Sequence, residues 1–117
     1  MKKYFVISGL MATAILFYNC SGSKKATASK PAPLSYETNL KTVIEANCSP
    51  CHIPAKGGNK KAYDNFANTK TDIDEMIRRV ELNPTDRGFM PFRGKAKLSD
   101  STIAVFKKWK EDGLLEK

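Results

Sequence analysis

The first stretch of the chain with apolar residues at helical spacing follows Ser35, a residue type that favours the N-cap of a helix. The apolar side chains recur three and four residues apart and therefore share one helical face: Tyr36, Leu40, Val43 and Ile44. The pattern predicts a helix that ends around residues 46–47. Such a helix delivers Cys48 at its carboxyl end.

A second apolar stripe predicts another helix in the middle of the chain, with Thr71 or Asp72 as its N-cap. The stripe covers two turns: Ile73, Met76, Ile77 and Val80. Pro84 is expected to end this helix. Before it, residues 53–61 are predicted to form a glycine-containing loop, and residues 62–67 a short helical stretch.

A last helix is predicted to begin after Ser99 or Asp100 and to stop at Gly113. Four of its residues have the spacing of a core face: Ile103, Phe106, Trp109 and Lys110. Residues 81–97 are expected to form an irregular loop that contains Met90. Helical patterns occupy almost all of this region, so the predicted fold class is all-α, with three to four helices.

Residues 1–19 have the parts of an export signal, since the basic pair Lys2 and Lys3 precedes an apolar run that ends before Cys20. The run is shorter than the about 18 to 20 apolar residues that a membrane span needs. We predict a signal peptide of the lipoprotein type over 1–19, because Cys20 resembles the cysteine that becomes lipidated in bacterial lipoproteins. A plain secretory signal cleaved elsewhere and an uncleaved anchor are the alternatives, and all three export the rest of the chain.

Residues 20–34 are small, polar and proline-containing, which is the composition of a flexible tether. The remaining residues, 35–117, suffice for one small domain. A domain of this size has little apolar surface of its own to bury, so a large cofactor at its centre would help it to fold.

The formal net charge of the chain is +8, which can favour nucleic acid, anionic lipid or an acidic protein surface. The lysines are scattered and lack the interleaved aromatic residues of a single-strand binder, so no nucleic-acid partner is expected. Lysines of the loops are hypothesised to steer an acidic redox partner, and the alternative is a solvated basic face. These lysines are Lys56, Lys60, Lys61, Lys95 and Lys97.

The candidate chemistry lies in Cys48, Cys51 and His52, a C-x-x-C-H run that predicts covalent attachment of one c-type haem. Two thiols three positions apart can each form a thioether with one of the two haem vinyl groups, and the next residue then lies beneath the iron. The neutral imidazole of His52 is the predicted iron ligand. Its other ring nitrogen needs an acceptor, and a backbone carbonyl of the following loop, such as that of Pro54, is a candidate.

The second axial ligand cannot be another histidine of this chain, because His52 is the only one. Outside the leader there are two methionines, of which Met76 lies on a predicted apolar helix face and is expected to fill the core. Met90 lies in a loop between glycines, beside aromatic residues and Pro91, so we predict that it ligates the iron. Open coordination is the alternative. His/Met ligation closes the iron to substrates, as an electron carrier requires, whereas a peroxidase or a gas binder needs an open position.

Other interpretations of the motif explain less of the chain. A thioredoxin-like dithiol needs a βαβ frame with substantial strands, which the sequence does not predict. A zinc site at Cys48, Cys51 and His52 lacks a second pair of ligands, since Cys20 lies across the tether. A disulfide between Cys48 and Cys51 would leave His52 and Met90 without a role.

Taken together, CSPCH, the glycine-containing loop, Met90-Pro91 and the ending LSDSTIAVFKKWKEDG resemble a small mono-haem class I c-type cytochrome over about Leu34 to Leu114. The resemblance implies a fold in which the first and last helices cross near a covalently bound haem, with Phe106 or Trp109 helping to enclose it. It implies a monomeric electron carrier between redox proteins, anchored by lipid and facing the periplasm or the cell exterior. A haem-based sensor or an accessory domain with labile Met90 ligation is the alternative.

Overall fold

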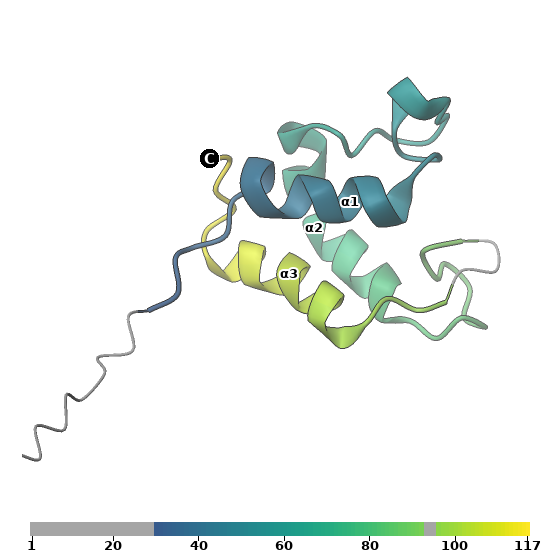
Figure 1. Ribbon diagram of the computed structural model, residues 1–117. Coiled ribbons are helices and arrows are strands. Elements are labelled where there is room, and N and C mark those ends of the chain that lie inside the picture. The colour runs from purple at the N-terminus through teal and green to yellow at the C-terminus, as the bar shows by residue number, and fades with distance from the viewer. Residues whose placement is uncertain (1–29, 93–95) are drawn as a thin grey trace, which may run out of the picture. The chain divides into compact units, whose positions relative to one another are not determined.

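The computed structural model describes residues 30–92 and 96–117. The predicted signal peptide, Cys20 and most of the predicted tether lie outside the described residues, as do Arg93, Gly94 and Lys95 of the Met90 loop. Residues 31–117 form one compact unit. Within the described ranges the fold is all-α, with three α-helices, two short helical turns and a single isolated bridge between Ser35 and Leu115 in place of any strand (Figure 1).

The first helix begins at the predicted cap, because the Ser35 side chain accepts a hydrogen bond from the amide of Thr38 at 3.3 Å. It starts with the π-helical turn η1, Tyr36–Leu40, and continues as α1, Lys41–Cys48. Cys48 therefore belongs to the last turn of the helix, one residue beyond the predicted end. The Ser49 hydroxyl completes this end by donating to the Glu45 carbonyl at 2.5 Å.

The second helix, α2, spans Phe66–Glu81, which corrects two predictions. Residues 62–65 are not helical, and neither Thr71 nor Asp72 is an N-cap. The cap is Asn65, whose side chain accepts from the amide of Asn68 at 2.9 Å. Thr71 lies inside the helix, where its hydroxyl donates to the Ala67 carbonyl at 2.9 Å. A residue type that favours N-caps can therefore also occur within a helix.

The third helix, α3, spans Asp100–Glu111, is capped by Ser99 and is followed by Gly113 at a φ of +97°, as expected. Of the predicted core face, Ile103, Phe106 and Trp109 are buried. Lys110 is exposed and pairs with Asp74 of α2 at 2.5 Å, so its assignment to the core was wrong. Its position next to Trp109 places it at the rim of the apolar face, where an ammonium group can remain in water.

The contacts between helices fix their directions. The rings of Tyr36, Phe66 and Trp109 meet with centroids 6.0 to 6.2 Å apart, which brings the starts of η1 and α2 to the end of α3. α2 and α3 are antiparallel, because ion pairs join Asp74 to Lys110 and Glu81 to Lys107. The end of α2 and the start of α3 therefore lie at the opposite end of the molecule, toward which α1 also runs (Figure 1).

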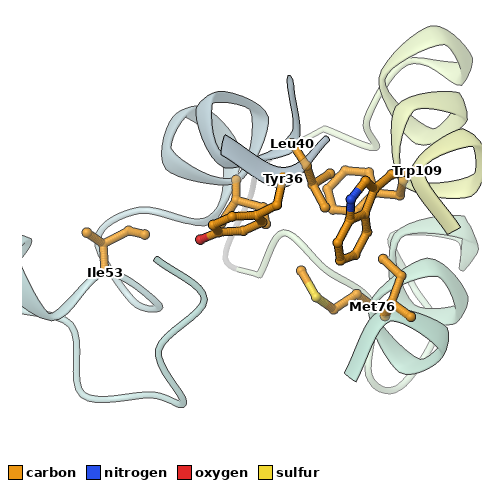
Figure 2. Close-up of a cluster of buried hydrophobic side chains, with 8 residues drawn as sticks. Tyr36, Leu40, Ile53, Met76 and Trp109 are labelled. Carbon is orange, nitrogen blue, oxygen red and sulfur yellow. The ribbon is translucent and has the colours of Figure 1, made fainter. Parts of the chain in front are cut away.

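The core is one apolar cluster to which every helix contributes: Tyr36, Leu40, Ile44, Ile53, Ile73, Met76, Phe106 and Trp109. Met76 is 7% exposed and fills the core, as its position on the apolar face predicts. In Figure 2, Met76 lies on the same side as the Trp109 indole, and Ile53 lies farther away, beyond Tyr36. Ile53 directly follows His52 and thus anchors the candidate motif to the core.

Hydrogen bonds join the start of the first helix, at residues 34–36, to the end of the chain after α3. The carbonyl of Leu115 accepts hydrogen bonds from the Tyr36 amide at 2.8 Å and from the Trp109 indole N–H at 2.7 Å. The Leu34 amide donates to the Asp112 carboxylate at 2.7 Å, so Leu34 already belongs to the folded unit. Among the described residues there is no helix that is both long and apolar enough to span a membrane.

Candidate functional site

The C-x-x-C-H motif forms a tight turn at the end of α1. The His52 amide donates to the Cys48 carbonyl at 3.1 Å, and the Ile53 amide donates to the Pro50 carbonyl at 3.0 Å. Cys51 is exposed, whereas Cys48 and His52 are half-buried. Cys48 and Cys51 do not form a disulfide, so both sulfur atoms are thiols. The turn presents all three predicted haem-binding side chains from a segment of five residues.

The following chain folds back along the motif. The Lys60 amide donates to the Cys51 carbonyl at 3.0 Å, and the Tyr63 amide donates to the His52 carbonyl at 3.0 Å. Gly58 makes the close approach possible, because a Cβ at that position would lie 2.3 Å from the Pro50 carbonyl oxygen. The loop backbone therefore supports the motif backbone directly.

His52 is oriented by this loop. Its Nδ1 lies 2.7 Å from the Lys61 carbonyl oxygen, which can only accept, so Nδ1 carries a proton, and in the neutral imidazole Nε2 then carries the lone pair. A backbone carbonyl was expected here, and the acceptor is that of Lys61 rather than that of Pro54. The arrangement is the one that fixes the tautomer of a metal-ligating histidine.

Tyr63 stacks on the His52 imidazole, with ring centroids 4.7 Å apart and ring planes inclined by 19°. Its hydroxyl donates to Asp72 Oδ2 at 2.9 Å. Burial, together with this bond to a carboxylate, raises the pKa of Tyr63 from 10.0 to about 12. The Lys61 ammonium lies 2.7 Å from Asp72 and, with the Tyr63 hydroxyl, lowers the pKa of that carboxyl.

The contact of Tyr63 with the motif was not predicted, since the sequence placed this residue only in a short helical stretch over 62–67. Asp72 was missed as well, because its spacing suggested a helix cap. Both residues lie outside the five-residue motif, and only the return of the loop onto α2 brings them to His52. An aromatic residue shortly after the motif was the only available signal.

Met90 lies in the segment between α2 and α3. It is half-buried, and its amide donates to the Arg79 carbonyl in the last turn of α2 at 3.2 Å. The neighbouring Phe89 is 6% exposed and anchors the segment, whereas Phe92 is 65% exposed. Of the two candidate methionines, Met76 is thus committed to the core and Met90 is not.

The motif and the Met90 segment lie at the same end of the helices (Figure 1). α1 ends at Cys48, and α2 ends at Glu81, shortly before Met90.

The residues at this end fit a covalently attached haem. The donor set comprises two thiols for the vinyl groups and an imidazole whose Nε2 can bind iron, with a thioether in the second segment. Across residues 30–92 and 96–117, no three side chains among His, Cys, Asp and Glu are grouped so that they could hold a metal ion on their own.

Several of the lysines proposed to steer a partner have contacts within the protein. Lys61 is paired with Asp72, Lys56 Nζ lies 3.4 Å from the Ser49 hydroxyl, and Lys97 donates to the Glu81 carbonyl at 2.7 Å. Lys95 lies outside the described residues. Lys56, Lys60 and Lys61 are exposed and belong to the loop that follows the motif.

No protein-family model, no curated protein and no solved structure matches this chain.

Proposed function

We propose that this chain is an exported c-type cytochrome that carries one covalently attached haem and transfers single electrons between redox proteins. It is an electron carrier rather than an enzyme. Cys48 and Cys51 would hold the haem through thioether bonds, and His52 and Met90 would ligate its iron.

The observation that carries the proposal is the state of His52. Its Nδ1 donates to the Lys61 carbonyl at 2.7 Å, which supports the proposal because Nε2 is then the nitrogen available to bind iron. A histidine that served only for packing would not need two thiols on the same turn or a glycine that lets the loop close over it. Gly58 and the Cys51 carbonyl thus support the same turn that presents the ligand.

The proposed carrier role depends on Met90. The haem, when bound, supplies a one-electron iron couple, and thioether ligation favours the ferrous state and a comparatively positive potential. The protein contributes ligands, orientation and exclusion of water. Phe89 precedes Met90 and Ile53 follows His52 in the chain, and both of these apolar side chains are buried.

The proposed partners are redox proteins with acidic docking surfaces, approached through the lysines around the motif. The proposed location is the outer face of a membrane, with the folded domain of a monomer held by a lipid on Cys20. This location agrees with the haem proposal, because c-type haem is attached outside the bacterial cytoplasmic membrane.

The deciding experiment is a pyridine haemochrome spectrum of the full chain, expressed together with a c-type haem maturation system and washed with acidified acetone. We expect one haem per chain that resists extraction. The Cys48→Ala/Cys51→Ala double variant should hold no covalent haem. A wild-type protein that matures without haem would remove the proposal.

The sharpest control is Cys20→Ala. This variant loses the third cysteine of the chain but keeps the motif, so its haem content per chain should equal that of the wild type.

A further inference from the structure

We propose that Tyr63 is a positioning residue that fixes the plane of the His52 imidazole, and that Asp72 holds Tyr63 in this role. The inference deepens the proposed function and rests on it, because it concerns the orientation of an iron ligand. It is carried by the near-parallel stack of the two rings, 4.7 Å between centroids and inclined by 19°.

The hydrogen bond to Lys61 alone leaves the imidazole some freedom. The last torsion of a histidine side chain is broad, so one acceptor at Nδ1 permits the ring to rock about that contact. A phenol ring lying flat against one face of the imidazole opposes this motion, because rocking would drive the two rings into each other. The stack thus supplies the restraint that the hydrogen bond lacks.

Tyr63 is itself held at both ends. Its amide donates to the His52 carbonyl at 3.0 Å, and its hydroxyl donates to Asp72 at 2.9 Å. Asp72 lies on α2 and is paired with Lys61, whose carbonyl is the acceptor for His52. Four residues therefore close a ring of contacts that begins and ends at His52, with one member on a helix.

This closed ring of contacts holds the imidazole plane relative to α2 as well as to its own loop. A fixed plane gives the iron one orientation of its axial nitrogen in every molecule, and it preserves that orientation when the charge on the iron changes. Neighbours that orient a metal-bound histidine commonly tune the metal in this way.

The test uses the haem-loaded full chain in its oxidised form and records the low-spin electron paramagnetic resonance spectrum. The wild type is expected to give one narrow set of g values. Tyr63→Leu should broaden or split the largest g value, because the imidazole then takes several planes. Tyr63→Phe and Asp72→Ala should broaden it less, since each keeps the aromatic ring but frees its far end.

Asp74→Ala is the matched control, since it removes a carboxylate from the same helix that pairs with Lys110 rather than with the motif. Its spectrum should equal that of the wild type. A Tyr63→Leu spectrum as narrow as the wild type overturns the role of Tyr63. Equal effects of Asp72→Ala and Asp74→Ala overturn the role of Asp72. If Tyr63→Leu does not accumulate, unchanged spectra of Tyr63→Phe and Asp72→Ala overturn the proposal.

Failure of this inference and failure of the proposed function are distinguishable. A wild-type protein without covalent haem counts against the proposed function. In a haem-loaded wild type, unchanged spectra of the variants count only against the positioning role. A nuclear Overhauser contact between the Tyr63 and His52 rings in the reduced protein is also expected, and its absence overturns the stack.

Discussion

The backbone amide of Met90 donates a hydrogen bond to the carbonyl of Arg79 at 3.2 Å, so the only methionine between α2 and α3 is held against the last turn of a helix. The bond satisfies one of the carbonyls that a helix leaves open at its end. It also fixes the backbone of Met90 without using its sulfur. This backbone bond does not involve the Met90 thioether that we propose as an iron ligand, whereas the other described methionine, Met76, is buried in the core.

Replacing Met90 with alanine should open the iron. We expect the Met90→Ala protein to keep covalent haem, to lose the thioether-to-ferric-iron absorption band and to bind carbon monoxide when reduced. Met76→Leu is the control, since a volume-conserving exchange in the core should cost less than about 1.5 kcal/mol of stability and leave the spectrum unchanged. Loss of the band in Met76→Leu alone would reassign the ligand, and ready binding of carbon monoxide by the wild type would favour the sensor alternative.

Gly58→Ala should disrupt the turn that carries the motif. The new methyl group would lie 2.3 Å from the Pro50 carbonyl oxygen and 2.6 Å from that of Cys51, so backbone must move. Such overpacking typically costs about 1–3 kcal/mol, which urea unfolding can measure, and we expect the yield of covalent haem to fall with it.

Gly57→Ala is the matched control for this variant. Gly57 has a φ of +82° and no atom within 4 Å of its added Cβ, so only the backbone cost of about 1–2 kcal/mol applies. Haem attachment should survive in Gly57→Ala. Equal haem yields in the two variants would show that the contact at Gly58 does not matter for the motif.

Alkaline pH should destabilise the fold through its two described tyrosines. Burial raises the pKa of Tyr36, and burial with the Asp72 bond raises that of Tyr63, each from 10.0 to about 12. A raised folded-state pKa means that the stabilisation is complete below pH 10 and disappears as pH rises toward about 12.

The tyrosine contribution can be isolated with Tyr63→Phe. The free energy of unfolding, measured in urea between pH 9 and pH 12, should fall less steeply in this variant than in the wild type, because one titrating phenol is gone. Lysines also titrate in this range, but they are the same in both proteins. Parallel pH profiles would show that the Tyr63 phenol has the same pKa in the folded and unfolded states.

Reversing the charges of Lys56 and Lys60 should slow electron exchange with an anionic redox reagent by roughly tenfold at low ionic strength. The effect should shrink as salt is added, because these charges are exposed. Lys41→Glu is the control, since Lys41 lies at the other end of α1 and pairs with Glu37. Rates that do not depend on ionic strength would leave only a solvated basic face.

Cys20→Ser should release the protein from the membrane fraction of cells that export it. The wild type is expected to carry a lipid on Cys20, detectable as added mass on the first peptide of the mature chain. Cys48→Ala should stay with the membrane, because it leaves the processing site intact. A Cys20→Ser protein that remains membrane-bound would favour the uncleaved anchor instead.

The sequence by itself determined most of the helical frame. Ser35 is the cap it predicts, and Ser99 is one of the two candidate caps it offers for the last helix. Ile103, Phe106 and Trp109 are buried as their spacing requires, because helix starts and apolar faces depend on neighbours in the chain. The C-x-x-C-H motif is likewise a local signal of five residues. The start of α2 was mistaken because Asn65, Thr71 and Asp72 are all competent caps, and propensity does not choose among them.

What only the tertiary structure decided is how distant residues meet. Three contacts arise when the loop folds back onto α2: the Lys61 acceptor for His52, the stack of Tyr63 on His52, and the hydrogen bond from Tyr63 to Asp72. The spacing of apolar residues in the sequence does not predict the course of that loop. The position of Met90 at the end of α2 depends on the helix directions in the same way. The sequence names the candidate ligands because their chemistry is local, whereas their orientation results from contacts across the whole fold.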